Sequence, residues 1–573
     1  MDPTLQHQMS AQHFLSLPRP DALEGPQGGA PDTSTLAAHD FDVDTRTGFM
    51  PPQQPLLRLP EEWNVWEDVL DAAIRGRLQL GGKEGVTEEE RRASEEWREG
   101  VRNMPILPTT PLKSSELLLR RAHLVLAWLL HFYIHTLPPS SPPTIPAPLT
   151  LPLLRVSRAL RLPPVITYSD DVLYNWRFTS TTPLADSYGN PTLPKVGNID
   201  AGTTFTGTRD EAEFYLTSAR MELRGTDALE VMRGIMDEVF VGDAIALSRV
   251  TSYLTELASI IEDLGEMLMR VKEMCSPQVF YDEIRPWFRG EDSSAGRWVF
   301  EGIEEDESLE RPRELSGASA GQSALVHALD VFLGVDKYSH GPSGSSSSPS
   351  TFSSSSTIST SSSMTSRSTA TAEEREQEQP RSSFLKRMQE YMPRHHRAFL
   401  NHLANSPRPL RDYVLANSTS STSTASTTSD SAGAELLQAY NAAVQALKVF
   451  RDKHMIIVAL YIVGPARRAA AAKAATSAFV PPATPSATSS ATPSTATPPA
   501  STPSGAPSTG ATETQGKETH GKEMRVETRR EARSEAEEEG KEVLKGTGGT
   551  DLVRFLKSVR DQTRGALIPL PEA

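Results

Sequence analysis

Hydrophobic residues recur every three or four positions along much of the chain, which is the spacing of one face of an α-helix. The pattern is longest over residues 208–274, where charged side chains occupy the opposite face. Shorter stretches of the same pattern cover residues 63–80, 115–136, 319–335, 383–406, 440–461 and 546–567. No stretch shows the convincing alternation of apolar and polar residues that is typical of a half-buried strand. The sequence therefore predicts an all-α fold.

Proline-rich stretches divide the chain into regions. Residues 1–36 are rich in Pro, Gly and Gln and are predicted to form a disordered leader. A proline-rich loop at 137–152 is the predicted boundary between two helical domains. We expect a small N-terminal helical domain at 37–152, packed on a larger helical domain at 153–468.

Low-complexity inserts interrupt the larger domain and follow it. Ser/Thr-rich runs occupy about 341–379 and 417–431, and an Ala/Pro/Thr/Glu-rich segment occupies 469–545. Such compositions cannot bury enough apolar surface to offset the entropy lost on ordering, so all three are predicted to be disordered. Residues 546–573 regain the helical pattern and are predicted to form a C-terminal loop and helix.

Composition narrows the classes of function. The 573-residue chain has a formal net charge of −15 and no long basic block in its periodic regions, so tight nucleic-acid binding is not expected. A single cysteine, Cys275, excludes an intrachain disulfide and cysteine-ligated zinc or iron–sulfur sites. We see no secretory signal, and the apolar runs 117–135 and 455–463 lack the roughly 20 uninterrupted apolar residues of a membrane span. These features predict a cytoplasmic protein without a membrane partner.

Common catalytic motifs are missing from the sequence. There is no GxSxG, no Walker-type Gly–Lys loop, no GxGxxG after a strand, no HExxH and no paired CxxC. The segment "GTGGTD" at 546–551 lacks the lysine and the preceding strand of a phosphate-binding loop. The chemistry therefore has to come from elsewhere, and the histidines are the next group to consider.

His454 occupies an unusual position for a histidine. It lies within one apolar helical stripe formed by Tyr440, Ala443, Leu447, Phe450, His454, Ile457 and Tyr461. A buried imidazole needs a partner for at least one ring nitrogen, which a backbone carbonyl, a carboxylate or a metal could provide. The pattern alone leaves an ordinary core histidine and a metal ligand both open. Helical folds that use one histidine usually use it on haem iron.

Six sequence blocks resemble the indoleamine 2,3-dioxygenase family. They are "RALRLPPVITYSDDVLYNW" (158–176), "FYDEIRPWFRG" (280–290), "SAGQSALVHALDVFLGV" (319–335), "MPRHHRAFL" (392–400), "FRDKHMIIVALYI" (450–462) and "GTGGTDLVRFLKSVRDQTR" (546–564). The blocks occur in the family's order and cover the chain from about 40 to 567 once the inserts are removed. The inserts resemble expansions in fungal members.

The resemblance implies a haem b site. His454 would be the proximal ligand of the haem iron, and Arg451 would pair with a haem propionate. Asp330 would support that arginine, although an ordinary helix–helix salt bridge between the two residues is the alternative. Ser319 and Ala320 match the family's loop over the haem.

The resemblance also implies a substrate pocket on the other side of the haem. Arg285 would pair with the carboxylate of L-tryptophan; without the resemblance, an arginine on a helix is usually a solvated charge. Phe214, Phe280 and Tyr168 match the aromatic residues that line the indole site. Ser218 matches a hydroxyl near the indole N–H.

The implied reaction is oxidative opening of the indole ring. L-Tryptophan and O₂ would give N-formylkynurenine, the first step of the kynurenine pathway towards NAD biosynthesis, and a reductant would keep the haem ferrous. Thr547 matches the mobile loop that closes over the substrate, and a monomer is expected. One alternative is a haem protein of the same fold with weak or no tryptophan turnover, motivated by Ala318 in place of a family glycine. A haem-free scaffold with phosphorylation-regulated inserts is the other alternative.

Overall fold

The computed structural model describes residues 41–139, 141–183, 185, 189–293, 296–335, 384–418, 427–478, 546 and 552–569. The predicted leader, most of the predicted inserts and Thr547 lie outside these described residues. The chain groups into two compact units, one of residues 1–466 with 545–573 and one of residues 467–544. The second unit is described only over 467–478, so the fold below is that of the first.

The all-α prediction is confirmed, because helices make up most of the described chain. The N-terminal part contains η2 (Glu61–Trp63), α3 (Asn64–Arg75), α4 (Glu88–Arg102), η3 (Pro111–Ser114), α5 (Glu116–His135), α6 (Ala147–Leu160) and the π-helical turn η4 (Ser169–Leu173). The middle contains α7 (Arg209–Val241), α8 (Ala244–Met269), α9 (Val271–Met274), α10 (Pro277–Val279), η5 (Phe280–Ile284), η6 (Arg285–Phe288), η7 (Glu291–Ser293) and η8 (Ile303–Glu305). The C-terminal part contains η9 (Ala320–Gln322), α11 (Ala324–Phe332), α13 (Phe384–Gln389), α14 (Arg394–Ala404), α15 (Leu410–Ser418), α16 (Thr427–Val458), η11 (Ala459–Val463), α17 (Gly464–Ala478) and α19 (Leu552–Gly565).

In the described part of the chain, four very short strands form two small sheets. β1 (Thr144–Ile145) pairs in parallel with β4 (Val299–Phe300), with Thr144 opposite Val299. β2 (Trp176–Phe178) pairs antiparallel with β3 (Ile199–Ala201), with Trp176 opposite Ala201. They fasten loops to the helices and form no layer of their own.

The N-terminal helices surround α5. Most residues of α5 are buried, because it is apolar on nearly every face and other elements cover it on all sides. α4 begins with a capping box, in which Thr87 and Glu90 satisfy each other's backbone N–H groups. α6 begins at Ala147, so the predicted proline-rich loop ends earlier than expected. Proline is tolerated in the first turn of a helix, which is why the prolines near Ala147 did not prevent it.

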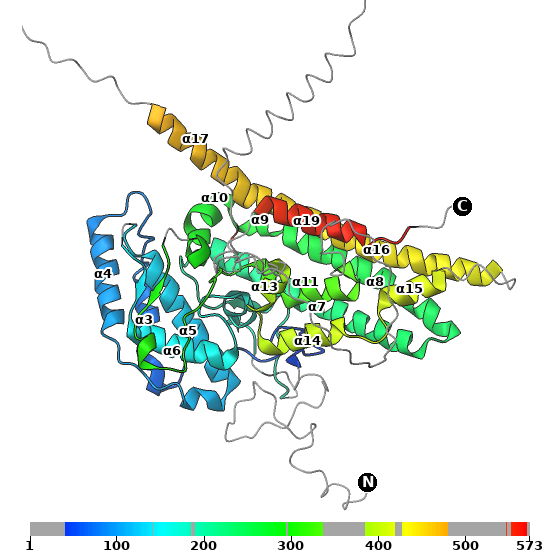
Figure 1. Ribbon diagram of the computed structural model, residues 1–573, viewed down its shortest axis with the longest axis horizontal. Helices are drawn as coiled ribbons and strands as arrows, with labels where there is room; N and C mark the ends of the chain where they lie inside the picture. The colour runs from blue at the N-terminus through cyan, green and yellow to red at the C-terminus, as the bar shows by residue number, and fades with distance from the viewer. Residues whose placement is uncertain are drawn as a thin grey trace, which may run out of the picture. The chain divides into compact units, whose positions relative to one another are not determined.

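The second group of helices is built on α7, α8 and α16, which lie side by side (Figure 1). Thr208 caps the start of α7, and Asp243 caps the start of α8 through two backbone N–H groups. Gly242 turns the chain between them in the left-handed conformation, at φ 65°. Apolar side chains of α7, α8, α11, α14, α15 and α16 pack into one hydrophobic cluster.

Two predicted disordered inserts are partly helical. α16 begins at Thr427, inside the predicted 417–431 insert, and α17 extends to Ala478, inside the predicted 469–545 insert. The alanine-rich start of the latter segment has high helix propensity, which composition-based disorder prediction ignores. The helix that carries His454 continues through Gly464 and Pro465, because α17 follows α16 and η11 directly. The π-helical turn η11 comes directly before Pro465, where the regular hydrogen-bond ladder would need the missing N–H.

Among the described residues, two helices are long and apolar enough to cross a membrane by length and composition. The first is α5, and 89% of its apolar window is buried inside the protein. The second is the continuous helix Ser431–Ala475, whose window is 22% buried. The sequence-based expectation that neither run is long enough was therefore wrong, because the helices continue past the charged and proline residues. The absence of a membrane partner stays a prediction.

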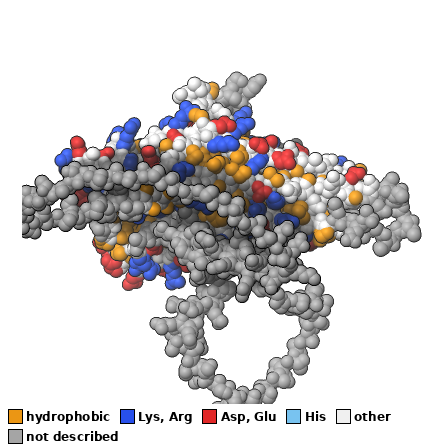
Figure 2. All heavy atoms as spheres, turned by 90° about the horizontal axis from the view of Figure 1, so that it is seen from above, with side chains coloured by type: hydrophobic (Ala, Val, Ile, Leu, Met, Phe, Trp, Pro, Cys, Tyr) orange, Lys and Arg blue, Asp and Glu red, His pale blue; other side chains and the backbone are white. Residues whose placement is uncertain are grey.

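Hydrophobic side chains are exposed on one face of the molecule. Figure 2 shows them gathered between charged side chains in the view from above. The exposed large hydrophobic residues include Ile456 and Leu460 on the α16–η11 helix and Val553 on α19. An amphipathic helix of a soluble core normally turns such residues inward.

Candidate functional site

A cavity of about 260 Å³ lies among α7, α8, α11, α16, α19 and the turns η4, η5, η6 and η9. Segments that are far apart in the sequence thus meet at one place. Ten of the eleven predicted site residues line it, namely Tyr168, Phe214, Ser218, Phe280, Arg285, Ser319, Ala320, Asp330, Arg451 and His454. The eleventh, Thr547, is outside the described residues, but its neighbour Gly546 lines the cavity. The structure brings the predicted residues together; their individual roles remain predictions.

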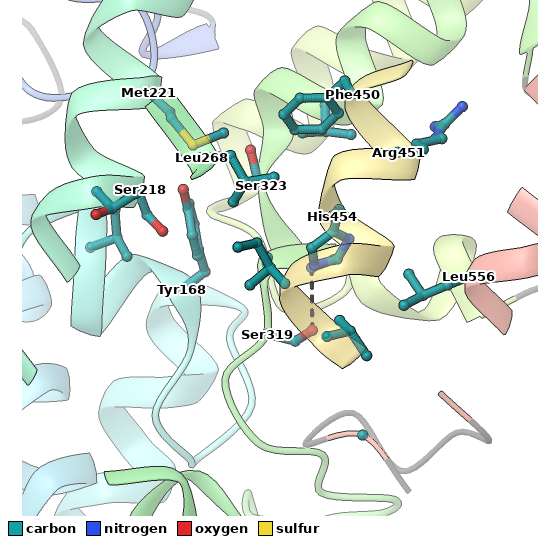
Figure 3. A pocket seen from close by; sticks show the side chains of 18 of the residues that line it. Tyr168, Ser218, Met221, Leu268, Ser319, Ser323, Phe450, Arg451, His454 and Leu556 are labelled. Carbon is teal, nitrogen blue, oxygen red and sulfur yellow. Dashed lines mark hydrogen bonds between the residues drawn. The ribbon is translucent and has the colours of Figure 1, made fainter. Parts of the chain in front are cut away.

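His454 lies on α16 at the cavity wall, and Figure 3 shows Ser319 pointing toward its ring. Burial, together with the nearby Arg451 cation, lowers the pKa of His454 to about 4. The imidazole is therefore neutral at physiological pH. A neutral imidazole is the form that offers a nitrogen lone pair to a metal.

A second histidine, His327, also lines the cavity but is bound to protein groups on both sides of its ring. Its Nε2 lies 2.9 Å from the Gly321 carbonyl oxygen, and its Nδ1 lies 3.3 Å from Nε2 of Gln389. His327 is 4% exposed. It is thus a hydrogen-bonded core histidine, and His454 is the better candidate for a metal ligand.

Arg451 connects three helices at the edge of the cavity. Its guanidinium donates to the Asp330 carboxylate on α11 and to the Thr563 hydroxyl on α19. Both charged side chains are almost fully buried, at 8% and 7% exposure. The predicted Arg451–Asp330 pair therefore exists, and Thr563 is a further partner that the sequence analysis did not identify. An arginine fixed in this way at a cavity wall could also hold an anionic group of a ligand.

Aromatic rings form one wall. The Phe214 and Phe280 centroids are 4.6 Å apart, and Phe280 lies 5.6 Å from the Tyr461 ring. Phe288, which the sequence analysis did not single out, stacks on Phe214 at 6.2 Å. Offset and edge-on contacts of this kind make a rigid apolar surface suited to a flat aromatic ligand.

Arg285 is a buried cation beside this aromatic wall. It is 7% exposed, and its guanidinium lies 5.7 Å from the centre of the Tyr281 ring. Burial, together with the Arg289 charge, lowers the pKa of Arg285 to about 10. The group stays protonated at neutral pH, so the cavity wall carries a buried positive charge of the kind that attracts a carboxylate.

A hydrogen-bond network centred on Glu222 was not predicted. The Tyr168 and Ser323 hydroxyls donate to Oε1 of Glu222 over 2.9 Å and 2.6 Å. Burial raises the pKa of Glu222 to about 7, and these two hydrogen bonds oppose the increase. Glu222 lies four residues after Ser218 on α7, so helical spacing could have placed both on the face toward the cavity.

The loop before α11 passes close to η6. A Cβ on Gly317 would lie 1.6 Å from the Phe288 carbonyl oxygen, so only glycine fits there. The Gln322 side chain ties this loop down, donating to the Gly317 carbonyl over 3.0 Å and accepting from the Tyr168 N–H over 2.8 Å. Ser319 caps the turn η9 by accepting from the Gly321 N–H. The backbone around Ser319 and Ala320 is therefore held in place at the cavity.

The donor set around the cavity fits haem better than a bare metal ion. No group of three or more His, Cys, Asp or Glu side chains that could hold a metal occurs in the described part of the chain. His454 would be a lone protein ligand, and a porphyrin supplies the remaining equatorial nitrogens itself. The apolar walls and the buried Arg451 suit the flat ring and an anionic edge of such a group.

Comparison with known proteins agrees with this arrangement. The family model for indoleamine 2,3-dioxygenase matches residues 37–566. Indoleamine 2,3-dioxygenase of Saccharomyces cerevisiae is 29% identical over 429 residues, covering 74% of this chain and 80% of the relative. Indoleamine 2,3-dioxygenase 1 of Rattus norvegicus is 25% identical over 536 residues, covering 93% and 96%. A 6-hydroxytryptophan 2,3-dioxygenase of Fusarium equiseti is 27% identical over 439 residues, covering 76% and 87%. The chain belongs to the indoleamine 2,3-dioxygenase family.

Proposed function

We propose that this protein is a haem-dependent dioxygenase that opens the indole ring of L-tryptophan to give N-formylkynurenine. The bond between C2 and C3 of the indole breaks, and each carbon receives one oxygen atom of O₂, so no net electrons are required. The observation that carries the proposal is a neutral imidazole, His454, facing an apolar cavity that also contains a buried guanidinium. Haem bound at His454 would supply the activation of O₂.

The chain's own residues would bind and orient the substrate. Arg285 would hold the substrate carboxylate, because a buried guanidinium forms strong paired hydrogen bonds with a planar anion. Phe214 and Phe280 would hold the indole between apolar faces and keep water away from it. Arg451, already fixed by Asp330, would hold a propionate of the haem. No catalytic base from the protein is needed in this scheme.

Haem binding and product formation can be tested in one cuvette. Protein reconstituted with haem is reduced under anaerobic conditions and then given O₂ and L-tryptophan. We expect a Soret band, followed by the near-ultraviolet absorbance of N-formylkynurenine. His454→Ala should lose the Soret band, whereas His327→Ala, which changes the other cavity histidine, should retain it.

Each of the other outcomes supports a different conclusion about the protein. A His454-dependent Soret band without product from tryptophan would identify a haem protein that does not turn over tryptophan. A Soret band that persists in His454→Ala would disprove the ligand assignment. Because one relative is named for 6-hydroxytryptophan, ring-hydroxylated tryptophans belong among the substrates to be tested.

A further inference from the structure

The cavity wall carries a carboxyl group that the proposed reaction does not use. Asp171 lies in the π-helical turn η4 and lines the cavity. It is 5% exposed. Its Oδ1 is buried and has no hydrogen-bond partner among the described residues. Few buried polar atoms in native proteins lack a partner, and one at a cavity wall calls for a ligand that completes it.

The preceding residue provides an internal comparison. Asp170 is equally buried, but its Oδ1 lies 2.8 Å from Nδ1 of His123, and its Oδ2 accepts from the N–H and hydroxyl of Thr167. Asp170 therefore has a complete structural role. The Oδ1 of Asp171, in contrast, has no such partner among the described residues, and leaving a buried oxygen unsatisfied is unfavourable.

The protonation state of Asp171 decides what it can bind. Burial raises its pKa well above the ordinary value, and the adjacent Asp170 charge adds to the increase. Burial thus favours the protonated form of the Asp171 carboxyl, which can donate through its hydroxyl and accept through its carbonyl oxygen. A ligand hydroxyl, which also donates and accepts, is the complementary group.

Asp171 lines the cavity from η4, whereas Arg285 lines it from η6 and His454 from α16, so the three side chains come from different elements of the fold. With the substrate carboxylate at Arg285 and the five-membered ring toward His454, the six-membered ring is the part left to face Asp171.

We propose that Asp171 is a specificity-determining residue that hydrogen-bonds a hydroxyl group on the six-membered ring of the substrate. The cavity would then prefer a ring-hydroxylated tryptophan to tryptophan itself. This inference rests on the proposed function for the orientation of the substrate. It makes the orphaned oxygen of Asp171 part of the substrate site.

The test compares substrates across variants of the holoenzyme. L-Tryptophan and hydroxytryptophans substituted at each position of the six-membered ring are compared by kcat/KM and by dissociation constants from spectral titration. We expect the wild type to favour one hydroxytryptophan by about 10-fold or more, as one satisfied buried hydrogen bond implies. Asp171→Ala should abolish this preference. Asp171→Asn should keep part of it, because an amide also donates and accepts.

Thr217→Val is the matched control. Thr217 lines the same cavity, but its hydroxyl donates to the Glu213 carbonyl within α7, so the substrate preference should not change. Thermal unfolding of each variant shows whether it folds.

The outcomes separate this inference from the proposed function. Turnover of tryptophan with the same substrate ratio in wild type and Asp171→Ala would overturn the role of Asp171 alone. Binding preference that depends on Asp171 without any turnover would support it while disproving the dioxygenase. A wild type that binds no hydroxytryptophan more tightly than tryptophan would also overturn it.

Discussion

At the scale of single residues, environment separates side chains of the same chemical type. His327 and His454 line one cavity, but only His327 has both ring nitrogens occupied by Gly321 and Gln389. Asp170 and Asp171 are neighbours in the chain, yet one is fully hydrogen-bonded and the other has an orphaned oxygen. Chemistry at this site therefore depends on which atoms remain available after packing.

Glu222 gives a prediction about pH at this scale. Its folded-state pKa is about 7, compared with an ordinary value of 4.5. Because the folded state binds the proton more tightly, Glu222 should lower the free energy of unfolding as pH rises from about 4.5 to 7, by about 3 kcal/mol in total, with no further change above pH 7. Glu222→Gln keeps an acceptor for Tyr168 and Ser323 but cannot ionise.

Urea unfolding of wild type and Glu222→Gln across this pH range measures the effect. The free energy of unfolding of the wild type minus that of Glu222→Gln should decrease between about pH 4.5 and 7 and stay constant above pH 7. Thr217→Val, a cavity variant that removes no ionisable group, should follow the wild-type curve. Parallel curves for wild type and Glu222→Gln would show that the Glu222 carboxyl titrates normally in the folded protein.

At the scale of elements, the site is assembled from helix ends and irregular turns. The π-helical turns η4 and η5 and the 3₁₀ turns η6 and η9 place Tyr168, Phe280, Arg285 and Ala320 at the cavity. Long helices α7 and α16 provide the rigid walls. Irregular turns of this kind are common at functional sites, because they re-aim side chains that a regular helix would turn away.

Gly317 tests how tightly the loop before α11 must approach η6. Gly317→Ala would place a Cβ against the Phe288 carbonyl, so the backbone has to shift and the variant should lose about 1–3 kcal/mol of stability. The shift should also displace the Ser319–Ala320 segment and weaken haem retention. Differential scanning fluorimetry and the Soret absorbance after gel filtration measure the two effects. Gly197→Ala, where nothing lies within 4 Å, is the control, and equal melting temperatures would contradict the close approach.

At the scale of the whole molecule, distant parts of the chain are joined beside the cavity. Arg451 on α16 contacts Asp330 on α11 and Thr563 on α19, and Asn441 exchanges two hydrogen bonds with the Ile568 backbone. The C-terminal helix is thereby fastened to the helix that carries His454. Stability and ligand binding should consequently be coupled here.

Breaking the buried Asp330–Arg451 ion pair should lower the free energy of unfolding by more than breaking an exposed surface ion pair would. Asp330→Ala would leave the Arg451 cation buried without its carboxylate, with a loss of about 3–5 kcal/mol in the free energy of unfolding. The double variant Asp330→Leu with Arg451→Met should recover most of that stability, because it leaves no buried charge. Chemical denaturation measures both. A single variant within about 0.5 kcal/mol of wild type would mean that the pair contributes nothing net.

Local information in the sequence determined the all-α class and the order of the main helices, whereas the resemblance of six sequence blocks to one family supplied the ten residues that share one cavity. Helical periodicity and short motifs are properties of neighbouring residues, so they can be recognised without knowledge of the fold. Composition predicted the inserts less well, because alanine-rich low-complexity sequence at the start of 469–545 still forms helix.

Only the tertiary structure decided which polar atoms are satisfied. The Glu222 network joins residues 54 and 101 positions apart, and the His123–Asp170 contact spans 47 positions. The hydrophobic periodicity of the sequence does not reveal such contacts, since they arise when separate helices and turns pack together. The orphaned oxygen of Asp171 and the raised pKa of Glu222 are consequences of that packing, because burial and missing partners are properties of the folded chain alone.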